Sequence, residues 1–290
     1  MSLFGILYQF SDSFTFLILA ALGLAIIFGM MGIINLAQGE FIMVGAYATT
    51  IIINQGFPYP VGILGGALAA ALLGFVMDRL IISHLYQRVL DSVVATWGIS
   101  LVLSEGMLQL FGPSMQSVSM PLGSVSIDGS KYSVYKLLLT LLAIGVVILI
   151  YLLFTKTEFG RKARATMQSR DISESLGVNT KAVYSETFVI GSALAGLTGA
   201  LYAPTMTITP TMGNNFMVQS FVTVMCGGAN PILGSVLSGG VLGLVNSTLS
   251  VTISAFFGKI GLLIITIIII RVLPTGFTGL IEKTGARRRR

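Results

Sequence analysis

Polar side chains that could contact a solute stand at a break between two apolar runs near the amino terminus. The segment 35–41 reads Asn-Leu-Ala-Gln-Gly-Glu-Phe and supplies two amides, from Asn35 and Gln38, and the carboxylate of Glu40. At such a break inside a membrane, freed main-chain groups and polar side chains can face a cavity. The alternative is a simple corner between two helices with a solvated Gln38 and Glu40, and the residues alone leave both open.

A second polar group lies within an apolar run over about 92–112. Trp97, Ser100 and Ser104 recur at i, i+3 and i+7, which predicts one shared helical face. Glu105 falls in mid-span, where a carboxylate is costly unless paired or hydrated, so it is the strongest single candidate for a solute path. Taken alone, Trp97 is better explained as an interfacial ring, and the serine hydroxyls as bonded back to their own helix.

Neutral hydrogen-bonding side chains crowd the segment 205–223, which leads into a short apolar run. Such a set suits a small, polar, uncharged solute. In the alternative, the threonines form an outside loop and only the last few polar residues reach membrane depth. Those residues are Gln219, Ser220 and Thr223.

The sequence holds no arrangement for catalysis. It lacks the G-x-x-x-x-G-K-[ST] phosphate loop and the G-x-S-x-G nucleophile motif. One histidine, His84, and one cysteine, Cys226, form neither a metal cluster nor a disulfide framework. We therefore expect no catalytic residue, no metal and no cofactor, and a protein that is not an enzyme. The scarcity of intramembrane charge also indicates that another subunit supplies the energy.

The elements that position these residues are apolar runs long enough to cross a membrane. The chain has 290 residues, 54% of them hydrophobic and 10% charged, whereas soluble domains average about 25% charged. An all-α polytopic protein follows, with eight to nine transmembrane or re-entrant helices in a single membrane domain over 1–290. The short runs at 38–55 and 216–230 are candidates for broken or re-entrant helices. The predicted spans lie near 13–33, 38–55, 61–83, 92–112, 135–155, 182–203, 216–230, 232–252 and 258–273.

The basic residues are sorted along the chain. Cytoplasmic loops at about 78–91 and 156–181, with the tail from Arg271, hold 14 of the 17 Lys and Arg, as the positive-inside rule predicts. This topology starts outside and ends with a cytoplasmic carboxyl terminus. The long outside loop, 113–134, predicts a small hairpin. The tail from Arg287 to Arg290 suits anionic headgroups, and no nucleic-acid binding is expected because the basic residues are not interleaved with aromatic ones.

An internal repeat relates two pairs of helices. A short apolar segment beginning at Phe41 ends in a Gly/Pro break and precedes a Gly-rich helix, and the segment beginning at Phe216 does the same. In the topology above the copies run in opposite directions, which is typical of transport proteins; the alternative is chance similarity between Gly-rich helices. Small residues at four-residue spacing, as in Gly191, Ala195 and Gly199, predict close helix packing.

The segment 156–181 combines basic residues with an apolar stripe and a glycine stop. It predicts a short amphipathic helix that docks on a cytoplasmic partner, or else an ordinary basic loop or a helix lying on lipid. The residues that would carry this contact are Gly160, Arg161, Arg164, Ala165, Arg170, Leu176 and Gly177.

At these motifs the chain resembles permease subunits of the branched-chain amino acid and urea ABC transporter family. Residues 23–24 and 32–40 are similar to its G-L…G-x-I-N-x-A-[HQ]-G-E motif, and 160–165 with 176–178 to its coupling loop. Residues 90–101, with Trp97, are closer to the urea branch, as are 168–170 and 212–221. Two positions depart from the family pattern. Glu105 stands where urea permeases are expected to have glutamine, and Asn230-Pro231 follows Gly227-Gly228 where the family more often has a second glycine and no proline.

The resemblance implies a permease without catalytic activity, switched between outward and inward openings by partner ATPases. Its partners would be a homologous second permease, two ATP-binding-cassette ATPases and an extracytoplasmic solute-binding protein, in a bacterial inner membrane. The favoured solute is urea or a short amide. The alternatives are branched-chain amino acids, a passive urea or solute channel, or an assembly subunit with no solute path.

Overall fold

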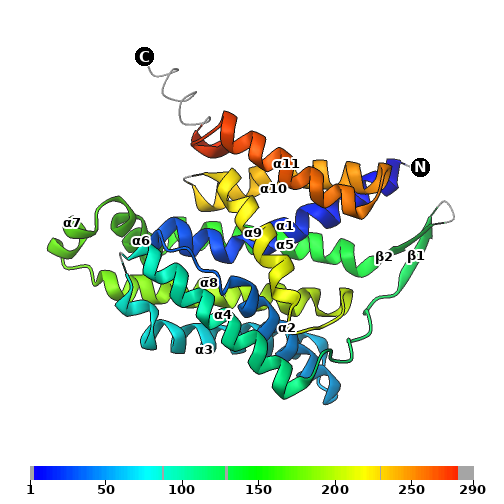
Figure 1. The fold of residues 1–290 in the computed structure, drawn as a ribbon, viewed down its shortest axis with the longest axis horizontal. Helices are drawn as coiled ribbons and strands as arrows, with labels where there is room; N and C mark the ends of the chain where they lie inside the picture. The colour runs from blue at the N-terminus through cyan, green and yellow to red at the C-terminus, as the bar shows by residue number, and fades with distance from the viewer. Residues whose placement is uncertain (1–2, 87, 128–129, 229, 280–290) are drawn as a thin grey trace. The chain divides into compact units, whose positions relative to one another are not determined.

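The computed structural model describes residues 3–86, 88–127, 130–228 and 230–279, and almost all of the regular structure in it is helical (Figure 1). Two short strands form the remainder. The elements are α1 (Leu3–Met31), α2 (Gln38–Asn54), α3 (Tyr59–Leu80), η1 (Ile82–His84), α4 (Val89–Phe111), β1 (Ser124–Ile127), β2 (Ser130–Ser133), α5 (Val134–Lys156), α6 (Glu158–Gln168), α7 (Arg170–Ser175), α8 (Thr180–Tyr202), η2 (Ala203–Thr205), α9 (Met212–Gly227), α10 (Pro231–Thr252) and α11 (Ala255–Val272).

Each of the nine predicted spans corresponds to one helix, so the all-α polytopic fold is confirmed. Seven helices of the described chain are long and apolar enough to cross a membrane. The other two helices that match predicted spans are α2, with 17 residues, and α9, with 16. These are the two apolar runs that the sequence marks as short. At about 1.5 Å per residue, each of these two helices covers about 25 Å, slightly less than the hydrocarbon thickness.

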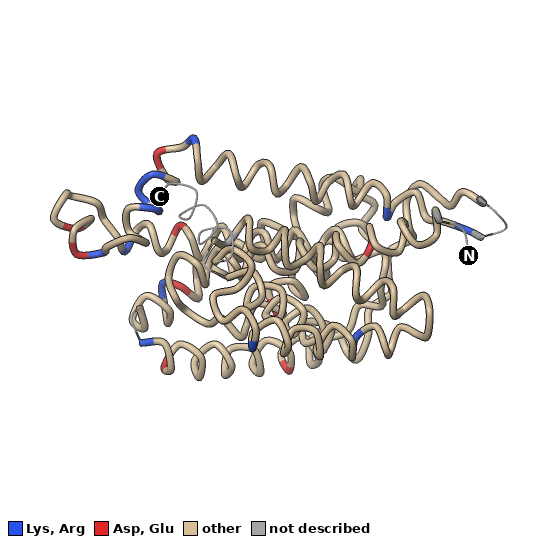
Figure 2. The backbone as a smooth tube through the Cα atoms, turned by 90° about the horizontal axis from the view of Figure 1, so that it is seen from above, with Lys and Arg blue, Asp and Glu red and all other residues tan. Residues whose placement is uncertain are grey.

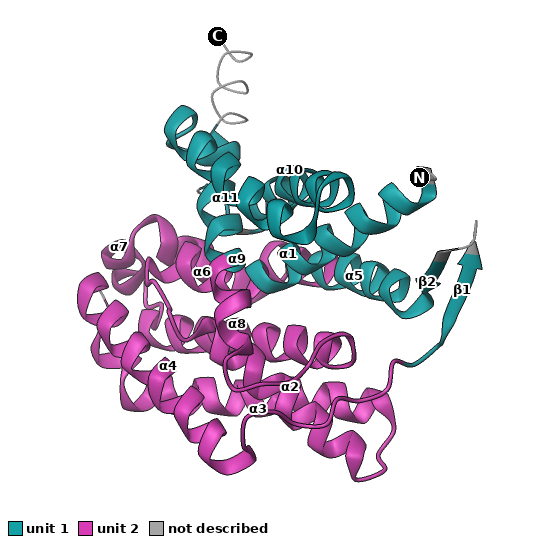
Figure 3. Ribbon diagram, turned by 45° about the vertical axis from the view of Figure 1, so that its right-hand side comes forward, with its two compact units in different colours: residues 1–21, 121–147, 219–290 teal, residues 22–120, 148–218 magenta. Residues whose placement is uncertain are grey.

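The chain divides into two compact units (Figure 3). The first unit comprises residues 1–21, 121–147 and 219–290, and the second comprises 22–120 and 148–218. The helices α1, α5 and α9 each contribute one part to each unit. The tail from Arg287 to Arg290 lies outside the described residues.

The core of the second unit is formed by α2, α3 and α8, which pack against one another. Small residues allow this close approach. A methyl group on Gly199 of α8 would collide with the carbonyl of Ile42 on α2, and one on Gly196 with Ala70 on α3. The small-residue spacing of α8 is therefore used for helix packing within the subunit, as the sequence predicts.

In the first unit, the amino-terminal part of α1 packs on α10. Gly239 of α10 faces Ile18, and Gly243 faces Phe14. An apolar cluster of Leu17, Cys226, Leu242, Leu262 and Ile269 joins α1, α9, α10 and α11. The hydroxyl of Ser220 on α9 donates a 2.7 Å hydrogen bond to the carbonyl of Ala20.

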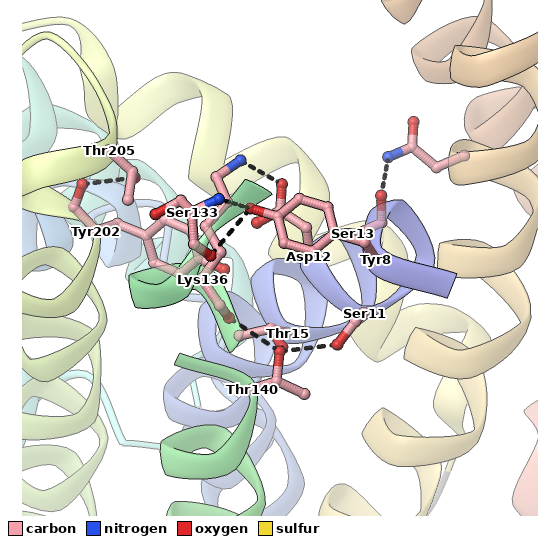
Figure 4. Close-up of polar contacts among 11 residues, drawn as sticks. Tyr8, Ser11, Asp12, Ser13, Thr15, Ser133, Lys136, Thr140, Tyr202 and Thr205 are labelled. Carbon is pink, nitrogen blue, oxygen red and sulfur yellow. Dashed lines mark hydrogen bonds and ion pairs between the residues drawn. The ribbon is translucent and has the colours of Figure 1, made fainter. Parts of the chain in front are cut away.

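Polar contacts fasten the start of α1 to the hairpin and to α5 within the first unit (Figure 4). The antiparallel strands β1 and β2 pair Ser124 with Ser133 and Val125 with Tyr132, which confirms the predicted hairpin. The hydroxyl of Tyr8 accepts a hydrogen bond from the main-chain nitrogen of Ser133 at 3.0 Å. One turn further along α1, Asp12 forms a 2.7 Å ion pair with Lys136 of α5.

The two predicted repeat copies share a pattern of elements. Each consists of a short helix, a break of a few residues and a helix of 22 residues, α3 or α10. A hydroxyl also joins each pair: Thr49 of α2 donates to the carbonyl of Gly62 at 3.0 Å, and Ser238 of α10 to that of Thr223 at 2.7 Å. The opposite orientation of the two copies in a membrane stays a prediction.

Positive charge in the second unit gathers at one end. All eight of its Lys and Arg lie within 79–88 or 156–181, and they surround α6, α7 and the junction of α3 with α4 (Figure 2, left). These are the loops that the sequence assigns to the cytoplasm by the positive-inside rule.

Candidate functional site

The break between α1 and α2 is fixed to α4 by hydrogen bonds. The side-chain oxygen of Asn35 accepts from the nitrogen of Ala37 at 3.1 Å. The nitrogen of Leu36 donates to the hydroxyl of Thr96 on α4, also at 3.1 Å. The break is thus a defined structure, with its main-chain groups satisfied partly by side chains.

The three polar residues of this break are buried. Asn35 and Gln38 have no exposed surface, and Glu40 is 2% exposed. One carboxylate oxygen of Glu40 accepts a 2.7 Å hydrogen bond from the hydroxyl of Ser100 on α4. The structure therefore excludes the solvated helix corner that the sequence leaves open, and it brings Glu40 and Ser100 together.

Several polar atoms of this cluster have no partner in the second unit or elsewhere in the described chain. They are the side-chain nitrogen of Asn35, both polar atoms of the Gln38 amide and the second oxygen of Glu40. A buried polar atom without a partner costs about 1–3 kcal/mol. Together they offer free hydrogen-bond donors and acceptors, which a bound polar solute would satisfy.

Glycines bring neighbouring helices directly against this cluster. The main chain of Gly39 touches that of Gly213 at the start of α9, and a Cβ on Gly213 would lie 2.6 Å from the free oxygen of Glu40. A Cβ on Gly23 of α1 would lie 2.7 Å from the Gln38 amide nitrogen. The main chains of α2 and of the start of α9 are thus in direct contact beside the cluster.

The predicted shared face of Trp97, Ser100 and Ser104 is divided in the structure. Ser100 points inward, Ser104 is half-buried and donates to the carbonyl of Ser100, and Trp97 is 57% exposed. Residues three apart point in directions that differ by about 60° around a helix. The boundary between the packed and open sides of α4 falls between the directions of Trp97 and Ser100. Glu105 also lies on the open side. The four residues therefore do not converge on one site.

The remaining path candidates belong to the first unit. The hydroxyl of Ser220 is bonded to Ala20, and that of Thr223 donates to the carbonyl of Gln219 at 2.8 Å. The Gln219 side-chain oxygen has no partner among the described residues. Packing thus accounts for the two hydroxyls, while Gln219 keeps a free acceptor.

The predicted coupling segment forms two helices where the sequence indicates one. Ser169 adopts an extended conformation that ends α6, and its hydroxyl then caps α7 through the nitrogen of Ile172. Thr157 caps α6 in the same way through Gly160. Gly177, with φ of +84°, ends α7 as the sequence predicts, since this left-handed conformation favours glycine.

Both short helices are anchored on one side and open on the other. Gly160 packs against the end of α5, and Arg164 donates to the carbonyl of Phe154 there. Arg170 bonds Glu174 at 2.8 Å and lies over the ring of Tyr184 on α8. The opposite side carries exposed side chains on α6, α7 and the turn that follows. The exposed members are Arg161, Lys162, Ala165, Met167, Ile172 and Leu176.

Sequence reasoning missed a polar group that connects α3 with α7 and α8. Asp78, buried at the end of α3, accepts a 2.5 Å hydrogen bond from the hydroxyl of Tyr86. The ring of Tyr86 meets that of Tyr184 edge-on, with centroids 5.2 Å apart. Burial, followed by the neighbouring Asp78, raises the pKa of Tyr86. The sequence did carry a signal for this group, because the carboxylate of Asp78 at the end of an apolar run requires a buried partner.

This geometry is that of a polytopic helical membrane protein with a polar break buried between its helices and two short helices, α6 and α7, packed against α5 and α8. Comparison with known families agrees. Residues 4–273 match the family described as the permease component of the branched-chain amino acid transport system. The chain belongs to this family, and its relatives are transport components and not enzymes, as expected.

Several relatives align over nearly the whole chain. The probable branched-chain amino acid permease LivH of Methanocaldococcus jannaschii is 28% identical, with 91% of this chain and 88% of that protein covered. LivH of Salmonella typhimurium is 24% identical, with 90% of each covered. The autoinducer 2 import permease LsrC of Salmonella paratyphi B is 24% identical over 72% of this chain and 60% of its own length. No solved structure matches.

The urea branch is not confirmed by these comparisons. The relatives that cover most of the chain are branched-chain amino acid permeases by name. Trp97, one of the residues that carried the urea-like resemblance together with 168–170 and 212–221, lies on the open side of α4, away from the buried polar break.

Proposed function

We propose that this chain is a permease subunit of an ATP-binding-cassette importer for branched-chain amino acids. Support comes from its family and from the names of the relatives that match about nine tenths of the chain. The observation that carries the proposal is the buried break at Asn35, Gln38 and Glu40, whose free donors and acceptors suit a zwitterion.

The chemistry of an amino acid fits this cluster group by group. Its ammonium would contact the free carboxylate oxygen of Glu40, and its carboxylate the free amide nitrogens of Asn35 and Gln38. The amino end of α2, beginning at Gln38, adds a positive partial charge toward an anion. Urea would match the amides equally well, but it has no cation for Glu40, so it remains the second candidate.

The proposed assembly contains this chain, a homologous second permease, two ATPases and an extracytoplasmic binding protein, in a bacterial inner membrane with the carboxyl terminus inside. The exposed side of α6 and α7, with Leu176, would contact an ATPase. ATP-driven movement of these helices would reach the polar break through α8, which packs on both α2 and α3. Separation of Gly39 from Gly213 would then open the break.

Uptake into proteoliposomes that contain all the co-encoded subunits tests this proposal. Radiolabelled leucine and urea are supplied with and without internal ATP. The proposal expects ATP-dependent leucine uptake that excess urea does not reduce. ATP-dependent urea uptake that excess leucine does not reduce would favour urea as the solute. Equal flux with and without ATP would indicate a passive channel.

A further inference from the structure

The open side of α4 carries a carboxylate among large apolar side chains. Val94, Trp97, Leu101, Glu105 and Leu108 follow one another at helical spacing, and all are exposed. Only 17% of the most apolar stretch of α4 is buried, against 78% of that of α8. Another surface must therefore cover this side of α4 when the protein is in a membrane.

Lipid is a poor cover for this side. Glu105 is six residues, or about 9 Å, from the end of α4, so its carboxylate lies within the apolar part of the span. No hydrogen bond or ion pair holds it within the described residues. By contrast, the exposed stretches of α5 from Leu137 to Leu152 are apolar throughout, as expected of a helix that faces lipid.

Water is also a poor cover. Three of the four residues one turn from Glu105 on this side, Leu101, Val102 and Leu108, are exposed and apolar, and the fourth is the uncharged Gln109. Gly98, on the same stripe, has no atom within 4 Å of where a Cβ would lie. A largely apolar surface with an open glycine and two polar side chains, Glu105 and Gln109, matches the contact between membrane helices, where small residues permit close approach and polar groups form hydrogen bonds across the contact.

We propose that this side of α4 is the contact surface for the second permease subunit, which presents a hydrogen-bond donor at the depth of Glu105. The proposal rests on the proposed function only for the existence of that subunit. A second copy of this chain fits less well, because a twofold axis through this surface would bring two Glu105 carboxylates to the same depth. The partner is therefore a different chain.

Site-directed spin labels distinguish the possible covers. Cys226, the single native cysteine, is replaced in Cys226→Ser, and labels are placed in Leu101→Cys on α4 or Ile144→Cys on α5. These two positions are matched, being 49% and 48% exposed and close to the middle of helices of 23 residues. Collisions with oxygen report lipid contact, and collisions with a nickel chelate report water.

In nanodiscs that hold the complete transporter, the label at Leu101 should lose contact with both reagents, while the label at Ile144 stays accessible to oxygen. This chain alone should regain oxygen contact at Leu101. Oxygen contact at Leu101 in the complete transporter would overturn the proposal in favour of lipid, and nickel contact in favour of a water-filled path. Strong spin–spin broadening between labelled copies would show that the partner at this surface is a second copy of this chain and would contradict the proposal of a different chain. None of these readings depends on the solute transported.

A second experiment removes the polar group and keeps an apolar helix. Glu105→Leu should reduce the second permease recovered with this chain, whereas Glu105→Gln, which can still accept a hydrogen bond, should retain most of it. Leucine at this depth favours membrane insertion, so misfolding is not the expected cause of a loss. Full recovery with Glu105→Leu would contradict the proposal.

Discussion

The hydroxyl of Ser100 donates a 2.7 Å hydrogen bond to the carboxylate of Glu40, a residue 60 positions away along the chain. Ser100 lies on the packed side of α4, and Glu40 in the first turn of α2, so this bond connects the polar break to a second membrane helix. It satisfies one oxygen of Glu40 and leaves the other without a partner. One oxygen of this carboxylate thus stabilises the contact between α2 and α4, and the other is free to contact the proposed solute.

Removing this donor should destabilise the subunit. Ser100→Ala leaves a buried carboxylate oxygen without a hydrogen bond, and we expect a loss of about 1–3 kcal/mol in the free energy of unfolding. Ser104→Ala is the matched control, because the hydroxyl of Ser104 only bonds the carbonyl of Ser100 one turn earlier. Thermal unfolding in detergent checks both. Equal melting temperatures for Ser100→Ala and Ser104→Ala would show that the bond to Glu40 contributes nothing.

Neutralising Glu40 should impair transport more than it impairs folding. Glu40→Gln keeps an acceptor for Ser100 but removes the charge proposed to bind the ammonium group. A hydrogen bond to a charged group contributes about 1.5–3 kcal/mol, so the apparent affinity for leucine should fall about tenfold or more. Initial uptake rates against leucine concentration measure this. Unchanged affinity in Glu40→Gln would place the ammonium site elsewhere.

The contact between α2 and α9 should be intolerant of any side chain. In Gly39→Ala, the new methyl group would lie 2.6 Å from the carbonyl carbon of Gly213, so the helices must separate. We expect a lower melting temperature. Gly145→Ala in α5 is the control, since nothing lies within 4 Å of its Cβ position; alanine there should stabilise the helix by about 0.5–1 kcal/mol. If the two variants melted alike, the contact would be unimportant for stability.

The positions of the helices could be predicted from the sequence because lipid imposes their length and apolar composition. Glycine spacing likewise predicted the packing face of α8, whereas the membrane side of each loop, assigned from charge sorting, stays a prediction. The conformation of Ser169, which divides the coupling segment into α6 and α7, depends on capping bonds that have no strong sequence signal.

The candidate site was only partly predictable. Asn35, Gln38 and Glu40 could be selected from the sequence because polar groups at a break inside a membrane must be bonded within the protein or line a cavity. Their burial, however, depends on which helices cover the break, and helical spacing alone could not assign Trp97 to the open side of α4. The pairing of Asp78 with Tyr86 was missed because residues eight apart can meet only when the chain between them turns, here through η1.

The group formed by Asp78, Tyr86 and Tyr184 should transmit movement between the coupling helices and the membrane helices. Tyr184 touches Tyr86 with its ring and also lies beneath Arg170 of α7. Tyr184→Ala removes both contacts, whereas Tyr184→Phe keeps the ring that makes them. If this group couples the two parts, Tyr184→Ala should reduce leucine uptake per ATP hydrolysed, and Tyr184→Phe should leave that ratio close to the native value.

Tyr86→Phe separates this role in coupling from a role in stability. It keeps the ring contact with Tyr184 but leaves buried Asp78 without a donor, so the free energy of unfolding should fall by about 1–3 kcal/mol while uptake per ATP stays the same below the melting temperature. Thermal unfolding and the uptake ratio, measured on the same proteoliposome preparations, give both quantities. If Tyr184→Ala lowered only the melting temperature, as Tyr86→Phe is expected to do, the ring contacts would be structural and the movement would reach α8 by another route.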